Sequence, residues 1–280
     1  MTIAAPDALA SPVIDTHCHL DIHDRHLHGG SLPDPDTLIA MAAAVGVTRI
    51  VQIGCDLESA RLSIELARTR PALIVGVGLH PNEAPRILEQ QGRAALDDAY
   101  AQIAAMAQDP IVRAVGETGL DYFRTAEELR PVQHESFRRH IAIAKQVGKT
   151  LVIHDRESHD DVMDILLEEG APDRVIFHCF SGDAAMAQRC AEQGWFISFA
   201  GVVTFTSARD LQQAAAIVPD DLILVETDAP YLTPVPNRGK PNASYLMPFT
   251  VRALAQLRGV DEAAMAGHLW ANAQRAFGAW

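Results

Sequence analysis

The sequence lacks the features that mark membrane, secreted and disulfide-rich proteins. No stretch reaches the roughly 18 consecutive apolar residues that a membrane-spanning helix needs, and the first residues carry Asp7 rather than the basic segment of a secretory signal. The cysteines form no CxxC pair, which favours reduced thiols over a disulfide framework; they are Cys18, Cys55, Cys179 and Cys190. We therefore expect a cytoplasmic protein without membrane association.

The chain also lacks an excess of basic residues. It has 23 Lys and Arg against 36 Asp and Glu, for a formal net charge of −13. An acidic protein repels polyanions at long range. A nucleic-acid substrate would therefore have to be held locally, by metal ions and a few basic side chains, because a broad basic groove is excluded.

Eight short apolar or β-branched runs are present along the 280 residues. They are continuous rather than alternating, which is typical of strands buried on both faces of a parallel sheet. The runs span residues 13–17, 49–53, 73–79, 112–117, 150–154, 174–178, 195–200 and 222–228.

The segments between the runs have helical spacing of apolar residues. We expect one helix to end at Gly148 and the next to begin with Ser158 as a cap-like residue. The predicted helices span residues 35–45, 57–67, 94–107, 128–147, 158–170, 183–193, 207–217, 246–257 and 262–277. Eight strand–helix units predict one domain over residues 1–280, a single (β/α)8 TIM barrel with an extra C-terminal helix. The alternative, an open doubly wound sheet, would need fewer strands and usually a glycine-rich loop where this chain has His17-Cys18-His19.

Polar side chains with metal-ligating groups stand at the ends of five of these runs. In a barrel the carboxyl ends of all strands meet at one face. Four imidazoles and two carboxylates buried at one face would be costly without a cation. The six residues are His17, His19, Glu117, His154, His178 and Asp228.

Six ligands are too many for one catalytic ion and suit two. We expect His17, His19 and Asp228 to share one divalent ion, and His154 and His178 to share the other. A carboxylate can bridge two ions whereas an imidazole cannot, so Glu117 is the expected bridge. Asp228 is expected to act as general base on a metal-activated water. Ligation by N and O without thiolate fits Zn, Mn, Ni, Co or Fe, and Mg less well.

Basic and polar residues near the same strand ends suggest an anionic substrate. We expect substrate contacts from His80, Arg156, Ser181, Arg238 and Lys240, the last two in a loop where barrels often bind phosphate. Strand alternation predicts that Cys18 and Cys179 point away from the site into the core. A polar loop holds three more histidines, which we interpret as a solvated or lid loop: His23, His26 and His28.

Several short blocks resemble the signature of the TatD family of metal-dependent hydrolases, in the amidohydrolase superfamily. They run in order from residue 13 to 278: His17-Cys18-His19, Gly78-Leu79-His80-Pro81, Gly116-Glu117-Thr118-Gly119-Leu120-Asp121, His154-Asp155-Arg156, His178-Cys179-Phe180-Ser181-Gly182, Glu226-Thr227-Asp228-Ala229-Pro230 and Asn272-Ala273. The resemblance implies a TIM barrel of the metal-dependent hydrolase type and two divalent ions on the same six ligands. It also implies DNase activity, often that of a 3′→5′ exonuclease on single-stranded ends. One departure concerns the substrate loop, where the family usually has Asn-Glu-Pro and this chain has Asn242-Ala243-Ser244.

Two other functions stay open at this point. The same metal site could hydrolyse a small amide, lactone or ester, because fold does not fix function. A metal-binding protein without catalysis is the third hypothesis, although all six ligands and the candidate base Asp228 are present. The expected partner is nucleic acid, as short or single-stranded ends, and the expected state is a monomer.

Overall fold

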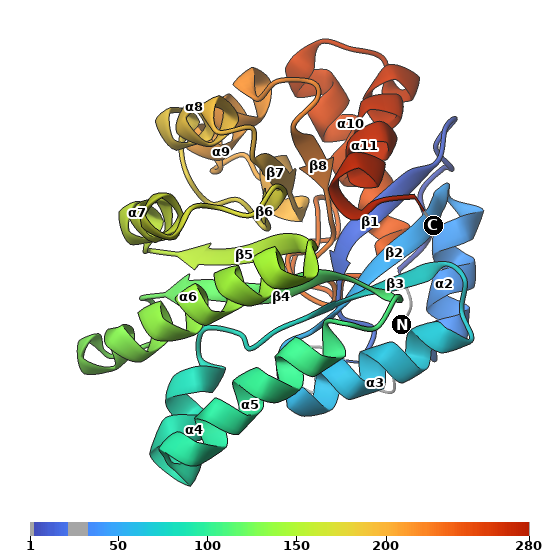
Figure 1. Ribbon diagram of the computed structural model, residues 1–280. Coiled ribbons are helices and arrows are strands. Elements are labelled where there is room, and N and C mark those ends of the chain that lie inside the picture. The colour runs from blue at the N-terminus through green and yellow to red at the C-terminus, as the bar shows by residue number, and fades with distance from the viewer. Residues whose placement is uncertain (1–2, 22–32, 280) are drawn as a thin grey trace. The chain divides into compact units, whose positions relative to one another are not determined.

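The structure is a computed structural model that describes residues 3–21 and 33–279. Its eight strands form an eight-stranded sheet in sequence order, and the pairs assigned to it are parallel (Figure 1). The strands are β1 (Val13–Cys18), β2 (Val47–Gly54), β3 (Leu73–Val77), β4 (Val112–Asp121), β5 (Thr150–Arg156), β6 (Val175–Phe177), β7 (Phe196–Phe199) and β8 (Ile223–Val225). All eight predicted runs are strands, so that part of the prediction is confirmed.

The helices also follow the predicted alternation. They are α2 (Pro35–Ala44), α3 (Leu57–Arg68), α4 (Glu83–Gln91), α5 (Arg93–Met106), α6 (Arg130–Val147), α7 (His159–Glu169), α8 (Ala184–Glu192), α9 (Arg209–Ile217), α10 (Met247–Arg258) and α11 (Glu262–Phe277), with short 3₁₀ turns η1 (Glu127–Leu129), η2 (Gly201–Thr204) and η3 (Ser244–Leu246). Only α4 was not predicted. It carries Pro85 in its first turn, where a missing N–H is tolerated, and Gly92 with φ of 85° separates it from α5.

Two compact units make up the chain, and each is described by itself. The first comprises Met1–Gln52, Gly182–Arg275 and Ala279, and the second Ile53–Ser181, Ala276–Gly278 and Trp280. The single domain expected over residues 1–280 stays a prediction. No helix among the described residues is long and apolar enough to cross a membrane.

In the first unit, β1 lies between β2 and the segment that follows β8. The apolar residues of β1 are fully buried, together with Ile50 and Phe199. The Asp228 N–H donates to the His17 carbonyl at 3.0 Å, and the His19 N–H donates to the Ala229 carbonyl at 2.9 Å. These backbone bonds hold the carboxyl end of β1 beside the residues after β8.

In the second unit, β4 and β5 pair along their length, and α6 packs on them (Figure 1). The register sets Gly119 opposite His154 and Asp121 opposite Arg156. Gly119 has φ of 136°, and a Cβ on it would lie 2.2 Å from the His154 carbonyl oxygen. Glycine is therefore required there, because it lets β4 approach β5 at His154.

Ser158 is the N-cap residue of α7, as predicted, but its hydroxyl makes no bond to the first turn of the helix. The hydroxyl oxygen lies 3.0 Å from the Leu120 carbonyl oxygen and 2.8 Å from Oδ1 of Asp155. The prediction for Cys179 is wrong. Cys18 is buried as expected, whereas Cys179 is only half-buried. Strand alternation does not extend to Cys179, because β6 ends at Phe177 and Cys179 has φ of 44°.

A buried histidine on α6 anchors the end of β3. The Leu79 N–H donates to Nε2 of His140 at 3.0 Å, and Nδ1 of His140 lies 2.7 Å from the Ser136 carbonyl oxygen. The neutral ring therefore carries its proton on Nδ1. Burial lowers the pKa of His140 to about 4 from 6.5.

This histidine should make the free energy of unfolding depend on pH. The folded pKa lies below the unfolded one, so the unfolded chain binds the proton first as the pH falls from 6.5 to 4. Stability should therefore fall across that window, by about 3 kcal/mol at most, with no contribution above pH 6.5. Urea unfolding between pH 4 and 7.5 should show a shallower dependence in His140→Gln, which keeps an acceptor for Leu79. Parallel pH profiles of the two proteins would contradict this.

Candidate metal centre

The first unit brings together three of the predicted ligands. Nε2 of His17 and Nε2 of His19 lie 3.2 Å apart. Oδ1 of Asp228 lies 3.4 Å from Nε2 of His19 and 3.8 Å from Nε2 of His17. Both histidine side chains are buried, and the Asp228 side chain is 16% exposed. Three ligand atoms of N and O type thus face one another at the carboxyl end of β1.

The backbone that carries Asp228 is held by buried polar groups. Asp228 has φ of 51°, a left-handed conformation that aspartate tolerates better than most residues. The Thr227 N–H and hydroxyl donate to Asp15 at 3.0 and 2.6 Å. Burial raises the pKa of Asp15 to about 7, although these hydrogen bonds lower it. Asp15 therefore connects β1 to the loop of Asp228.

The segment that departs from the family pattern lies inside this unit. The Asn242 side chain donates to the Thr227 carbonyl at 2.8 Å and to the Tyr231 carbonyl at 2.7 Å, so it holds the Asp228 loop. Ala243 and Ser244 are buried, and the Ser244 hydroxyl lies 3.5 Å from the Cys18 sulfur. The two residues that differ from the family pattern therefore lie in buried packing.

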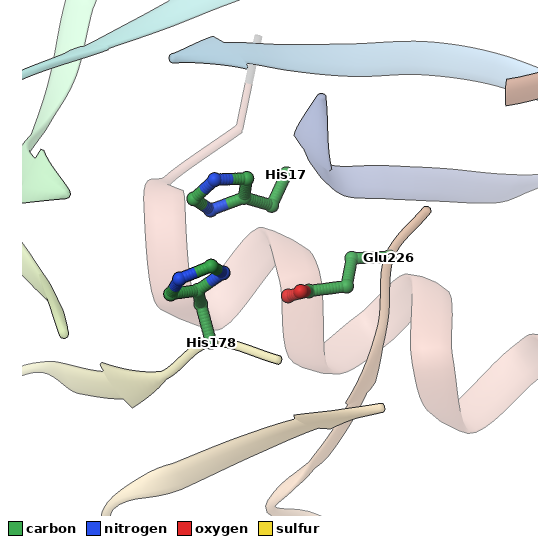
Figure 2. A group of neighbouring side chains, drawn as sticks. All are labelled: His17, His178 and Glu226. Carbon is green, nitrogen blue, oxygen red and sulfur yellow. The ribbon is translucent and has the colours of Figure 1, made fainter. Parts of the chain in front are cut away.

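Glu226 is a carboxylate that the sequence reasoning missed. It directly follows β8 and is fully buried. Figure 2 shows its carboxylate, on the segment after β8, and the His17 imidazole, on β1, projecting in the same direction; His178, also drawn, belongs to the second unit. The sequence offered one signal for it, because Glu226 directly ends the apolar run of β8, as the predicted ligands end theirs.

The second unit brings together the other three predicted ligands. Oε1 of Glu117 lies 3.2 Å from Nδ1 of His154, and Oε2 lies 3.6 Å from Nε2 of His178. One ligand atom from each of these residues lies within 4.8 Å of those from the other two. Glu117 and His178 are buried, and His154 is half-buried. This trio is the second candidate ligand set.

His80 also contacts Glu117. Its Nε2 lies 3.2 Å from Oε1 of Glu117, and its Nδ1 accepts the Asn82 N–H at 3.2 Å. Burial, with the neighbouring His154, lowers the pKa of His80 to about 3. The ring is thus neutral, and because Nδ1 accepts, the proton is on Nε2 and faces Glu117.

Asp121 faces the other ring nitrogen of His154. Its Oδ2 lies 3.4 Å from Nε2 of His154, and its Oδ1 accepts the Arg124 N–H at 2.9 Å. Burial lowers the pKa of His154, but Asp121 and Glu117 outweigh it and raise the pKa to about 9. A carboxylate behind a ligating histidine fixes its ring orientation and its tautomer. The sequence reasoning missed this role because it ended the strand at Glu117.

The predicted substrate contacts lie in both units. In the second unit, the Arg156 guanidinium lies 3.8 Å from the centre of the Phe123 ring, and the Ser181 hydroxyl donates to the Asp155 carbonyl at 3.1 Å. In the first unit, Arg238 lies 4.4 Å from the centre of the Phe205 ring. Lys240 is exposed in the same loop as Arg238. The predicted lid histidines His23, His26 and His28 lie outside the described residues.

Sequence and structure comparisons identify the class of protein. Solved structures that resemble the chain include a TatD homologue of Escherichia coli, YjjV, with a TM-score of 0.84, 27% identity and coverage of 95% of this chain and 98% of that one. The eight parallel strands thus form a (β/α)8 barrel with the architecture of the TatD structures, as predicted. Two relatives are described as uncharacterized metal-dependent hydrolases. TatD of Mycobacterium tuberculosis is 44% identical over 95% of this chain and 98% of its own length, and YcfH of E. coli is 37% identical over 89% of each.

The family follows from a match that spans almost the whole chain. The family described as TatD related DNase matches residues 14–278. The chain therefore belongs to the TatD family and is a metal-dependent hydrolase, as the signature blocks predicted.

Proposed function

We propose that this hydrolase is a deoxyribonuclease that removes nucleotides from single-stranded DNA in the 3′→5′ direction. The observation that carries the proposal is the pair of N/O ligand sets at the strand ends. They are His17, His19 and Asp228 in one unit and Glu117, His154 and His178 in the other. The family to which the chain belongs is described as TatD related DNase. Phosphodiester hydrolysis is chemistry that such ligand sets support.

The donor chemistry of these residues fits divalent cations. Imidazole and carboxylate without thiolate suit Zn, Mn, Ni, Co or Fe, and Mg less well. His17, His19 and Asp228 would hold one ion, and Glu117, His154 and His178 would hold the other. When bound, two divalent ions activate water and stabilise the charge that develops on the phosphate.

The chain's own residues would position the DNA strand and accept the proton of the attacking water. Asp228 is the proposed general base, because its side chain is partly exposed while His17 and His19 are buried. His80 holds its proton toward Glu117 and thereby orients that carboxylate. Arg156, Arg238 and Lys240 supply local positive charge for a phosphodiester on a chain whose net charge is −13. Because the protein would bind only the end of the DNA strand, its affinity for DNA should depend only weakly on salt concentration.

The direct test is a cleavage assay on a single-stranded oligonucleotide labelled at its 5′ end. Protein loaded separately with Mg, Mn, Co, Ni or Zn should produce a ladder of products shortened from the 3′ end. Chelation should stop the reaction and the same ion should restore it. Absence of shortened products with every ion would refute the proposal. Turnover of a lactone or acyl-amide panel by the same preparation would then assign a small-molecule substrate.

A further inference from the structure

Phe123 is more exposed than any other large apolar side chain in the described part of the chain. Its exposed fraction is 57%, and it lies in the loop directly after β4, the strand that carries Glu117 and Asp121. A single exposed apolar residue is common on protein surfaces and needs no function by itself. Phe123 differs from such residues in the side chain that it contacts and in its position near the candidate metal ligands.

The partner is Arg156, whose guanidinium lies 3.8 Å from the centre of the Phe123 ring. Among the described residues no carboxylate forms an ion pair with Arg156. The rings in two other such pairs, Tyr100 beside Arg139 and Phe196 beside Arg275, are buried. The Phe205 ring beside Arg238 is half-buried, and Phe205 is not among the exposed large apolar residues. Phe123 and Arg156 thus combine an exposed ring with a cation that has no carboxylate partner in the described chain.

The backbone fixes this pair next to the ligand set of the second unit. Arg156 lies opposite Asp121 in the β4–β5 register, and the Tyr122 N–H donates to the Arg156 carbonyl at 2.9 Å. The Arg124 N–H donates to Asp121 at 2.9 Å and closes the turn that carries Phe123. Arg156 follows His154 by two residues along β5, so both side chains leave the same face of the strand.

The neighbouring residue, Tyr122, is also aromatic but has a structural role that Phe123 lacks. Tyr122 is part of the scaffold, since its hydroxyl bonds to Asp161 and His134, and Arg130 lies 4.1 Å from the centre of its ring. Phe123 has no polar atom that could serve such a network. The exposed ring therefore contributes a flat apolar face beside the candidate metal ligands.

We propose that Phe123 and Arg156 form a nucleotide subsite, in which a base of the substrate strand stacks on Phe123 and a neighbouring phosphate binds Arg156. Base stacking on an aromatic ring tolerates every base, and Arg provides the charge for the phosphate. Such a subsite suits an acidic protein, because it holds one nucleotide without a basic groove. The inference rests on the proposed nuclease function and names the residues that hold the strand.

The test measures binding as well as cleavage. The metal-loaded protein is titrated into a fluorescein-labelled single-stranded oligonucleotide with phosphorothioate linkages at its 3′ end, and anisotropy gives the Kd. Phe123→Leu should weaken binding about 10-fold, while Phe123→Trp should retain it. The weakening should disappear when one particular nucleotide near the 3′ end is replaced by an abasic residue. Leu167→Ala, which removes a similarly exposed side chain from α7, is the matched control and should bind as wild type does.

Arg156 has a separate signature. Arg156→Gln should weaken binding to intact and abasic oligonucleotides alike and lower the slope of log Kd against log salt by about one. Wild-type affinity of Phe123→Leu for all oligonucleotides would overturn the subsite, even if the wild type cleaves DNA. Base-dependent binding through Phe123 without cleavage would keep the subsite and reject the nuclease. No binding by the wild type would overturn both.

Discussion

Replacing Asp228 with asparagine should lower kcat for the metal-dependent reaction by about 10³-fold, the scale of a lost general base. Asparagine keeps the side-chain shape and tolerates the left-handed backbone at φ of 51°. The backbone bond from residue 228 to the His17 carbonyl does not involve the carboxylate and should remain. Folding should therefore be preserved, and the loss should fall on the chemical step.

Steady-state kinetics with metal analysis of the same samples checks this result. Asp228 lies 3.4 Å from His19, so it could act as a ligand as well as a base. A fall in kcat at unchanged metal content assigns the base, whereas a parallel loss of metal assigns the ligand. Asp210→Asn, an exposed aspartate in the first turn of α9, is the matched control. A kcat within tenfold of wild type at full metal content would exclude Asp228 as base.

The fold was predictable because burial leaves a strong trace in the sequence. Strands buried on both faces read as continuous apolar runs, and all eight were found. The errors lie where a local conformation departs from the pattern. The helix α4 was not predicted, because Pro85 is an unfavourable residue in a helical sequence pattern. The positive φ of Cys179 interrupts the alternation of side chains that is expected along a strand. The Ser158 hydroxyl bonds to Leu120 from the neighbouring strand, a contact that local sequence does not contain.

The candidate site was predictable in its ligands and not in their surroundings. Strand ends locate residues such as His154 and His178 in the second unit, because neighbouring parallel strands end on the same side. Asp121 was missed because β4 continues four residues beyond Glu117 before it ends. Phe123 was missed because its significance depends on Arg156, which lies on a different strand. Which residues pair across strands depends on register, and register is a tertiary property.

Replacing Glu117 with glutamine should have the second large effect, a loss of bound metal. Glu117 contacts three imidazoles, with 3.2 Å to His80, 3.2 Å to His154 and 3.6 Å to His178. Glutamine keeps the shape but removes the negative charge, and its amide nitrogen cannot ligate a cation. Loss of a partner that only orients a ligand costs about 10- to 100-fold in metal affinity. Loss of this carboxylate should weaken binding at least about 100-fold.

Calorimetric titration of metal into the chelated protein distinguishes the roles of Glu117. If Glu117 bridges two ions, Glu117→Gln should lose both high-affinity sites, because each loses the shared carboxylate. If Glu117 serves only the ion of His154 and His178, one site should remain on His17, His19 and Asp228. Glu89→Gln, an exposed residue on α4, is the control and should bind metal as wild type does. Unchanged stoichiometry and affinity in Glu117→Gln would contradict the prediction and exclude the negative charge of Glu117 as a determinant of metal binding.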